Sequence, residues 1–215
     1  MTHAIPKKRI RCFIALSLPD KVIAPIFDLQ NRLKECGPNI NPNVNLNIKW
    51  TLPENMHITL KFLGDITFDQ IWEAKRRLSI LAQHTRPFSI KAAGIGFFPG
   101  AKNARIIWTG IQGEIHALSR FHETIEAYLS MFPSEKRPFK SHVTLGRSKG
   151  RIPSKTAEKW LSRRHEFQTP IGLCHDMALY KSDLKKTGAI YTPLARWRLS
   201  NGDAPPHQTM ATHES

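Results

Sequence analysis

Runs of apolar residues with two different spacings divide most of the chain into predicted strands and helices. Short runs rich in β-branched and aromatic residues predict strands over 9–18, 47–51, 56–63, 87–98, 104–111, 138–147, 166–181 and 188–199. Apolar residues that recur every three or four positions predict helices over 19–35, from Thr67 to Ala82, over 114–131 and over 154–164. The chain is therefore expected to mix both kinds of element.

Local signals refine several of these segments. Thr67 and Gln70 have the form of a capping box, ahead of an apolar helix stripe made of Ile71, Ala74, Leu78, Leu81 and Ala82. Pro25 lies inside the first predicted helix and is expected to kink or shorten it. Segment 37–47 is rich in asparagine and proline, which predicts a loop. His122 lies on the apolar stripe of the helix over 114–131, where a structural role is expected.

Length and periodicity predict one domain made of two lobes. The 215 residues are enough to bury a sizeable core. A single bilobal domain is expected over 9–199, after a basic extension at 1–8. Residues 200–215 lack apolar periodicity and predict a disordered tail. The two halves of the domain carry their elements in a loosely similar order, which suggests a pseudo-two-fold arrangement.

The most informative pattern is a tetrad that occurs twice, as His57-Ile58-Thr59-Leu60 and His142-Val143-Thr144-Leu145. Each copy lies in a predicted strand, where successive side chains point to opposite faces. The histidine and threonine of each copy therefore share one face, and the apolar pair anchors the strand on the other. If the two strands lie side by side, two imidazoles and two hydroxyls converge on one cleft. Such a set can supply an acid, a base and anion binding for phosphate ester chemistry.

Charge and cysteine content indicate the class of binding partner and the cellular compartment. The formal net charge of +15 favours a polyanionic partner such as RNA. Several basic residues flank the second tetrad, namely Lys136, Arg137, Lys140, Arg147, Lys149 and Arg151. Three widely spaced cysteines indicate reduced thiols and a cytoplasmic protein. The sequence has no apolar stretch long enough to cross a bilayer and no metal-ligand motif, so neither a membrane nor a metal is expected.

Four segments resemble the 2H phosphoesterase superfamily, and within it the RNA 2′,3′-cyclic phosphodiesterases, which are LigT-like and were formerly described as 2′-5′ RNA ligases. They are the opening strand at 11–20, the two tetrad blocks at 50–64 and 137–147, and the final strands at 179–198. The resemblance covers about 9–199. It departs at the 37–47 loop and after residue 200, and neither segment contains a tetrad residue.

The resemblance implies an α+β fold with two pseudo-symmetric lobes, antiparallel sheets flanking a central cleft, and helices on the outside. It also implies a cytoplasmic hydrolase without cofactors that opens 2′,3′-cyclic phosphate ends of RNA to 2′-phosphomonoesters. The resemblance makes His57 the proton donor and His142 the proton acceptor, a distinction that the symmetric sequence does not make by itself. A monomer is expected.

Five further side chains complete the expected site. Thr59 and Thr144 would donate hydrogen bonds to the phosphate oxygens. Arg147 would add positive charge, although an unbroken strand turns it away from His142, so Gly146 must allow a bulge or turn. Trp50 and Phe13 are candidates for stacking a terminal base, and both also suit the core.

Three other functions stay open at this point. Ligation of RNA, or cleavage of 2′-5′ oligonucleotides, would use the same residues at the same site. A non-enzymatic RNA-binding module would account for the charge and leave the paired tetrads unexplained. A metal-dependent phosphoesterase would need a cluster of ligands that the sequence lacks.

Overall fold

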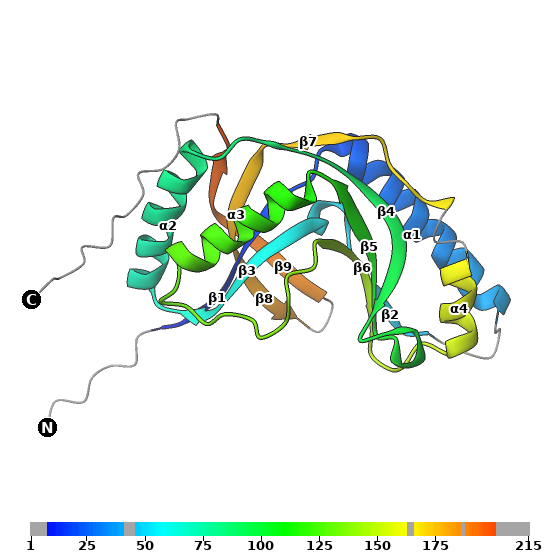
Figure 1. Ribbon diagram of the computed structural model, residues 1–215. Coiled ribbons are helices and arrows are strands. Elements are labelled where there is room, and N and C mark those ends of the chain that lie inside the picture. Colours follow the sequence, from blue (N-terminus) through cyan, green and yellow to red (C-terminus); the bar gives the residue numbers. More distant parts are fainter. Residues whose placement is uncertain (1–7, 41–45, 163–165, 186–187, 201–215) are drawn as a thin grey trace, which may run out of the picture.

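The computed structural model describes residues 8–40, 46–162, 166–185 and 188–200, and it shows one curled antiparallel sheet with helices packed around it (Figure 1). The strands are β1 (Ile10–Ser17), β2 (Ile48–Trp50), β3 (His57–Ile66), β4 (Phe88–Phe98), β5 (Ile106–Gly113), β6 (His142–Ser148), β7 (Gly172–Cys174), β8 (Asp176–Lys185) and β9 (Gly188–Arg198). The α-helices are α1 (Asp20–Ile40), α2 (Phe68–Gln83), α3 (Ile115–Tyr128) and α4 (Ser154–Ser162).

The order of strands divides the sheet into two related halves. Along the sheet the order is β7-β4-β5-β6-β3-β1-β8-β9, and β2 pairs separately with β6. Each half thus has four strands, and the halves join where β6 meets β3. The predicted α+β class with two antiparallel lobes is confirmed, and the two lobes share one continuous sheet.

Helices cover the two halves from outside (Figure 1). The α1 and α4 helices pack together and against β4, whereas α2 packs against β9 and α3 against β3. The capping box predicted for α2 is present. The Thr67 side chain accepts a hydrogen bond from the Gln70 main-chain amide, and the Gln70 side chain accepts one from the Thr67 main-chain amide. Among the described residues, no helix combines the length and the apolar character needed to cross a membrane.

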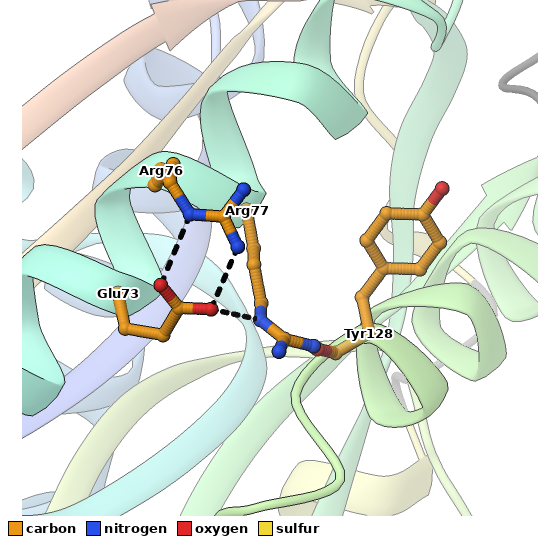
Figure 2. Close-up of polar contacts among 4 residues, drawn as sticks. All are labelled: Glu73, Arg76, Arg77 and Tyr128. Carbon is orange, nitrogen blue, oxygen red and sulfur yellow. Dashed lines mark hydrogen bonds and ion pairs between the residues drawn. The ribbon is translucent and has the colours of Figure 1, made fainter.

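A three-residue ion cluster ties α2 to the end of α3 (Figure 2). The Glu73 carboxylate accepts hydrogen bonds from Arg76 at 2.9 and 3.0 Å and from Arg77 at 2.6 Å. These bonds lower the pKa of Glu73 to about 2. Arg77 also donates to the Tyr128 carbonyl at 2.7 Å, so the cluster joins the two helices on the lobe that contains β3.

The core contains the apolar side chains that the strand pattern turned inward. Ile58, Val143 and Leu145 are fully buried, and Leu60 is 2% exposed. Cys12 and Cys174 are buried free thiols. Burial and the nearby Asp65 raise the pKa of Cys12 to about 11, which makes it a packing residue with little thiolate character.

Several predicted boundaries were wrong. The α1 backbone continues past Pro25 to Ile40 and includes the first residues assigned to the 37–47 loop. Proline removes one hydrogen bond from this helix, and burial of Val22, Ile26, Leu29 and Leu33 outweighs that loss. The strand predicted over 166–181 is two strands interrupted at His175. Four other predicted segments lie outside the described residues: the extension at 1–7, the centre of the loop at 41–45, the end of the last helix and the tail at 201–215.

Candidate active site

The two tetrads meet at the junction of the lobes. β3 and β6 run antiparallel and pair at Ile58 and Val143. In that register His57 lies across from Thr144, and Thr59 lies across from His142. All four polar side chains are half-buried on the face opposite to Ile58 and Val143. The structure therefore brings the two histidines and the two threonines of the sequence prediction together.

The two imidazoles are held in the same way. His57 Nδ1 lies 2.7 Å from the Asn55 carbonyl, and His142 Nδ1 lies 2.7 Å from the Lys140 carbonyl. Because a carbonyl oxygen can only accept, each Nδ1 carries its hydrogen and each Nε2 is left for proton transfer. His57 Nε2 lies 3.1 Å from Thr59 Oγ1. The carbonyl comes from two residues before the histidine in both tetrads, so the arrangement repeats with the pseudo-symmetry.

The surroundings of both histidines favour the neutral imidazole. Burial lowers the pKa of His57 to about 4; the hydrogen bond to Asn55 opposes this shift, and the charges of His142 and Arg147 add to it. Burial likewise lowers the pKa of His142, with Arg147 and Lys140 contributing in the same direction. Positive charge next to the imidazoles makes the cleft an attractive position for an anion, whose binding would favour protonation.

Each motif strand contains a bulge at the leucine of its tetrad. In β3 the partners in β1 pass from Thr59 to Lys61 and omit Leu60. In β6 the partners in β5 pass from Thr144 to Gly146 and omit Leu145. An extra residue reverses the alternation beyond it. Phe62 and Arg147, each five residues after its histidine, therefore return to the face of the cleft.

The bulge at Leu145 is the irregularity that the sequence analysis required for Arg147 to face the cleft. The sequence located the necessary irregularity at Gly146, and the structure has it one residue earlier. Arg147 is exposed, and its charge lowers the pKa of both histidines. Gly146 has another use: a Cβ there would lie 2.8 Å from Ile48 and 3.0 Å from the Trp50 ring.

A buried glutamine of α1 supports the second bulge. Gln30 is 1% exposed, and its amide donates to the Leu145 carbonyl at 2.9 Å and to the Thr51 carbonyl at 2.7 Å. The Thr51 amide donates to the same Leu145 carbonyl at 2.9 Å. These bonds satisfy the carbonyl of the bulged residue, which would otherwise be buried without a partner.

Aromatic rings pack beside each histidine. The His57 ring centroid lies 5.0 Å from that of Phe13 and 5.4 Å from that of Tyr191. His142 lies edge-on to Phe98 at 5.0 Å and to Trp108 at 6.1 Å. Trp108 is accommodated by Gly96 of the next strand, because a Cβ there would come within 2.1 Å of the indole. These rings restrict the orientation of both imidazoles.

The two aromatic side chains proposed for base stacking pack against other protein groups. Phe13 is 2% exposed and packs among His57, Tyr180 and Tyr191, so its faces are covered by protein. Trp50 packs on the core beside Trp160 of α4 and beneath the Lys34 ammonium of α1. Both residues were open to a core role because their sequence context is apolar. In the structure packing is the role they have.

The segment between α3 and β6 is held against the β3 lobe. Lys61 is 3% exposed, pairs with Glu126 and donates to the Pro133 carbonyl at 3.1 Å. Ser134 donates to Glu126 at 2.6 Å. The His122 and Phe139 rings stack with centroids 4.1 Å apart, which gives His122 the packing role expected of it. These contacts hold the segment that carries the Lys140 carbonyl, the partner of His142.

Sequence reasoning missed several of these contributors. The Asn55 and Lys140 carbonyls belong to the main chain, so no side-chain pattern marks them. Gln30 lies on the buried face of a helix 115 residues from its partner Leu145, and Trp108 lies in an ordinary apolar strand. The only available signal was the double tetrad itself, which showed where such partners had to converge. In the described parts of the chain, no three His, Cys, Asp or Glu side chains form a group that could hold a metal ion.

The chain resembles known proteins over most of its length. Residues 16–108 match the family model described as LigT like phosphoesterase. An Aquifex aeolicus protein named RNA 2′,3′-cyclic phosphodiesterase is 31% identical over 178 residues, which cover 80% of this chain and 94% of the relative. The solved structure of TT0787 of Thermus thermophilus superposes with a TM-score of 0.70 at 26% identity, covering 90% of this chain and 99% of that one. E. coli LigT complexed with 3′-AMP shares the fold, with a TM-score of 0.64 at 20% identity and coverages of 90% and 99%.

Proposed function

The chain belongs to the LigT-like phosphoesterase family, and on that premise we propose that it opens 2′,3′-cyclic phosphate ends of RNA to 2′-phosphomonoesters. One observation carries the proposal. Two imidazoles, each with Nδ1 bound to a main-chain carbonyl, lie on neighbouring strands, and each lies across from a threonine on the same face of the sheet. The name of the Aquifex relative supplies the substrate class.

The proposed reaction needs one proton acceptor and one proton donor. His142 Nε2 takes a proton from water as the water oxygen bonds to phosphorus. The bond between phosphorus and O3′ breaks, and O3′ takes a proton from His57 Nε2. The 2′-phosphate remains on the ribose, and the two histidines return to their starting states by exchange with solvent. Each proton transfer contributes about 10² to 10⁴-fold to the rate.

The other cleft residues act on the phosphate. As water adds, negative charge grows on the non-bridging oxygens, where the Thr59 and Thr144 hydroxyls can donate. Arg147 supplies positive charge near both histidines and favours the same charge distribution. The assignment of His57 as donor follows the family resemblance, because the Nδ1 contacts of the two imidazoles are alike and do not distinguish donor from acceptor. The enzyme is proposed to act as a cytoplasmic monomer.

The identity of the product tests this proposal. Purified protein is incubated in excess EDTA with a short RNA that ends in a 2′,3′-cyclic phosphate, and the product is examined by phosphorus NMR. A 2′-phosphomonoester that resists a 3′-specific phosphatase is expected. A 3′-phosphate product would mean that the substrate binds in the opposite orientation.

Two further outcomes would point to the other functions. Tight binding of the RNA without turnover would replace the enzyme with an RNA-binding module. A joined 2′-5′ product that forms in preference to hydrolysis when a 5′-hydroxyl RNA is added would make ligation the principal activity.

A further inference from the structure

The second histidine is held by a carbonyl that belongs to an irregular segment of the chain. Residues 129–141, the connecting segment, lie between the end of α3 and the start of β6, outside both elements. Near the end of this segment, the Lys140 carbonyl lies 2.7 Å from His142 Nδ1. The hydrogen bond at one ring nitrogen sets which tautomer an imidazole adopts. The position of the connecting segment therefore affects the state of His142 Nε2.

The carbonyl that holds the first histidine is fixed in a different way. It belongs to Asn55, at the end of a short 3-10 turn over Pro53–Asn55. A main-chain hydrogen bond closes this turn, from the Asn55 amide to the Leu52 carbonyl at 2.9 Å. The partner of His57 is thus fixed by its own neighbours in the sequence, whereas the contacts that hold the connecting segment come from distant residues.

Lys61 joins the start of the connecting segment to β3. This lysine is 3% exposed and lies two residues after Thr59 of the first tetrad. Its ammonium pairs with Glu126 of α3 and donates to the Pro133 carbonyl of the connecting segment at 3.1 Å. The Glu126 carboxylate also accepts from the Ser134 hydroxyl at 2.6 Å. Two successive residues of the segment are thus tied to one ion pair.

The same ion pair is connected to the end of the segment through a histidine of α3. Glu126 Oε1 lies 3.7 Å from His122 Nε2, one turn earlier in the helix. The His122 ring stacks on Phe139, the residue before Lys140, with centroids 4.1 Å apart. The pair of Lys61 and Glu126 is therefore linked to the connecting segment both at its start and next to the carbonyl that holds the second histidine.

Stability alone is a poor reason for a lysine at this position. Lysine is rarely buried unless it is paired, and the cost of taking two charges out of water offsets most of their attraction. An apolar pair in such positions often stabilises a fold as well as the ion pair does. An apolar pair cannot, however, bind the Pro133 carbonyl and the Ser134 hydroxyl, so the ion pair is needed for these contacts.

We propose that Lys61 is a positioning residue for His142: it ties the connecting segment to β3 and thereby fixes the Lys140 carbonyl that sets the tautomer and orientation of this imidazole. The effect on catalysis rests on the proposed function. The two motifs become interdependent, because a side chain from the strand of His57 orients the histidine of the other strand. Lys61 takes no part in proton transfer itself, since its ammonium is buried and already paired.

Nitrogen-15 NMR of the two imidazoles in the free protein tests this role directly. In the wild type, Nδ1 of both neutral rings should carry the hydrogen. Lys61→Met is expected to move the nitrogen shifts of His142 toward those of an imidazole that exchanges between tautomers, and to leave the shifts of His57 unchanged. Single-turnover opening of a nucleoside 2′,3′-cyclic phosphate should slow by about 10- to 10²-fold, because a displacement of about 1 Å at a reacting group has an effect of this size.

The double variant Lys61→Met/Glu126→Met separates positioning from stability. Two apolar side chains should recover much of the melting temperature lost in Lys61→Met, because neither charge is then left buried alone. They cannot bind Pro133 or Ser134, so the altered His142 spectrum and the slow single-turnover rate should persist. Recovery of the wild-type spectrum and rate together with the melting temperature would overturn the proposal.

Arg77→Met is the matched control. Arg77 also pairs with a carboxylate and donates to a main-chain carbonyl at the end of α3, that of Tyr128, but it joins this end to α2 (Figure 2). Both imidazole spectra should stay unchanged in this variant. A change at His142 like that in Lys61→Met would assign the effect to loosening of α3 and overturn the proposal, as would unchanged His142 shifts in Lys61→Met. If the His142 shifts move as expected but the wild type opens no cyclic phosphate, the proposed function fails while the positioning of the ring stands.

Discussion

The low pKa of His57 leads to a quantitative prediction about the pH dependence of the reaction. Burial lowers this pKa from its usual 6.5 to about 4, and burial lowers the pKa of His142 as well. At pH 7 only about one free enzyme molecule in a thousand carries a proton on His57. Protonating this imidazole in the empty cleft costs about 3 kcal/mol more than in a solvated histidine, at about 1.4 kcal/mol per pKa unit.

The consequence for kcat/KM follows from the sign of the shifts. A general acid must be protonated and a general base must be neutral, so kcat/KM is bell-shaped and follows the pKa values of the free enzyme. Because both values are lowered from 6.5, the maximum should lie between about pH 4 and 6.5, with a tenfold fall per pH unit well above it. The curve for kcat should lie at higher pH, because a bound phosphodiester anion favours protonation of both histidines.

The assay combines kinetics with NMR. Initial rates on a nucleoside 2′,3′-cyclic phosphate give kcat/KM between pH 4 and 9, and nitrogen-15 spectra follow the two imidazoles in the free protein. The same spectra should show Nδ1 protonated in the neutral form of both rings. A kcat/KM that stays maximal up to pH 8, or a His57 that titrates near 6.5 in the free protein, would refute this reasoning.

Four further outcomes are expected. Arg147→Ala should lower kcat/KM on RNA and make kcat/KM less sensitive to salt. The substitution should also raise the pKa of both histidines, because the guanidinium lowers these pKa values. Unchanged kinetics and titrations would place this residue outside the reaction. Gln30→Leu should reduce the free energy of unfolding by about 1–3 kcal/mol in denaturant titrations, because the buried Leu145 carbonyl and the part-buried Thr51 carbonyl each lose a donor. Equal midpoints would contradict this role of the glutamine. The folded protein should lose stability as the pH falls from 6.5 toward 4, because the unfolded chain binds a proton at His57 in that range and the folded chain does not. His57→Gln should make this decline in stability less steep. An equally steep decline in that variant would assign the decline to other groups. Activity should survive excess EDTA, since the sequence contains no metal-ligand motif, and a loss that zinc or manganese reverses would favour a metal-dependent reaction.

Much of the fold followed from local patterns. The strand positions of the tetrads and the capping box of α2 depend on contacts within a few residues, and these predictions agree with the structure. The start of β6 at His142, later than predicted, reflects contacts that no local pattern contains. Residues 133–140 are held by Lys61, Glu126 and His122, which come from distant parts of the chain.

The site was predictable in its chemistry and less so in its geometry. The double tetrad indicated that two histidines and two threonines share a cleft, and alternation along a strand was enough for that. The position of Arg147 depended on a bulge, which the sequence assigned to Gly146 and the structure has at Leu145. The roles of Phe13 and Trp50 could not be assigned from the sequence. The residues around an aromatic side chain in an apolar strand look the same whether its ring faces the cleft or the core. In the assembled sheet Phe13 is buried, and Trp50 is partly buried and packs against the core.

The central claim is that two histidines transfer the protons. The most direct measurement is the single-turnover rate at which an RNA 2′,3′-cyclic phosphate end is opened, compared between the wild type, His57→Ala and His142→Ala at the pH optimum. The account predicts that each variant keeps its fold, as judged by circular dichroism, and loses at least about 10²-fold in rate. A correctly folded variant of either kind that opens the ring at close to the wild-type rate would contradict the account.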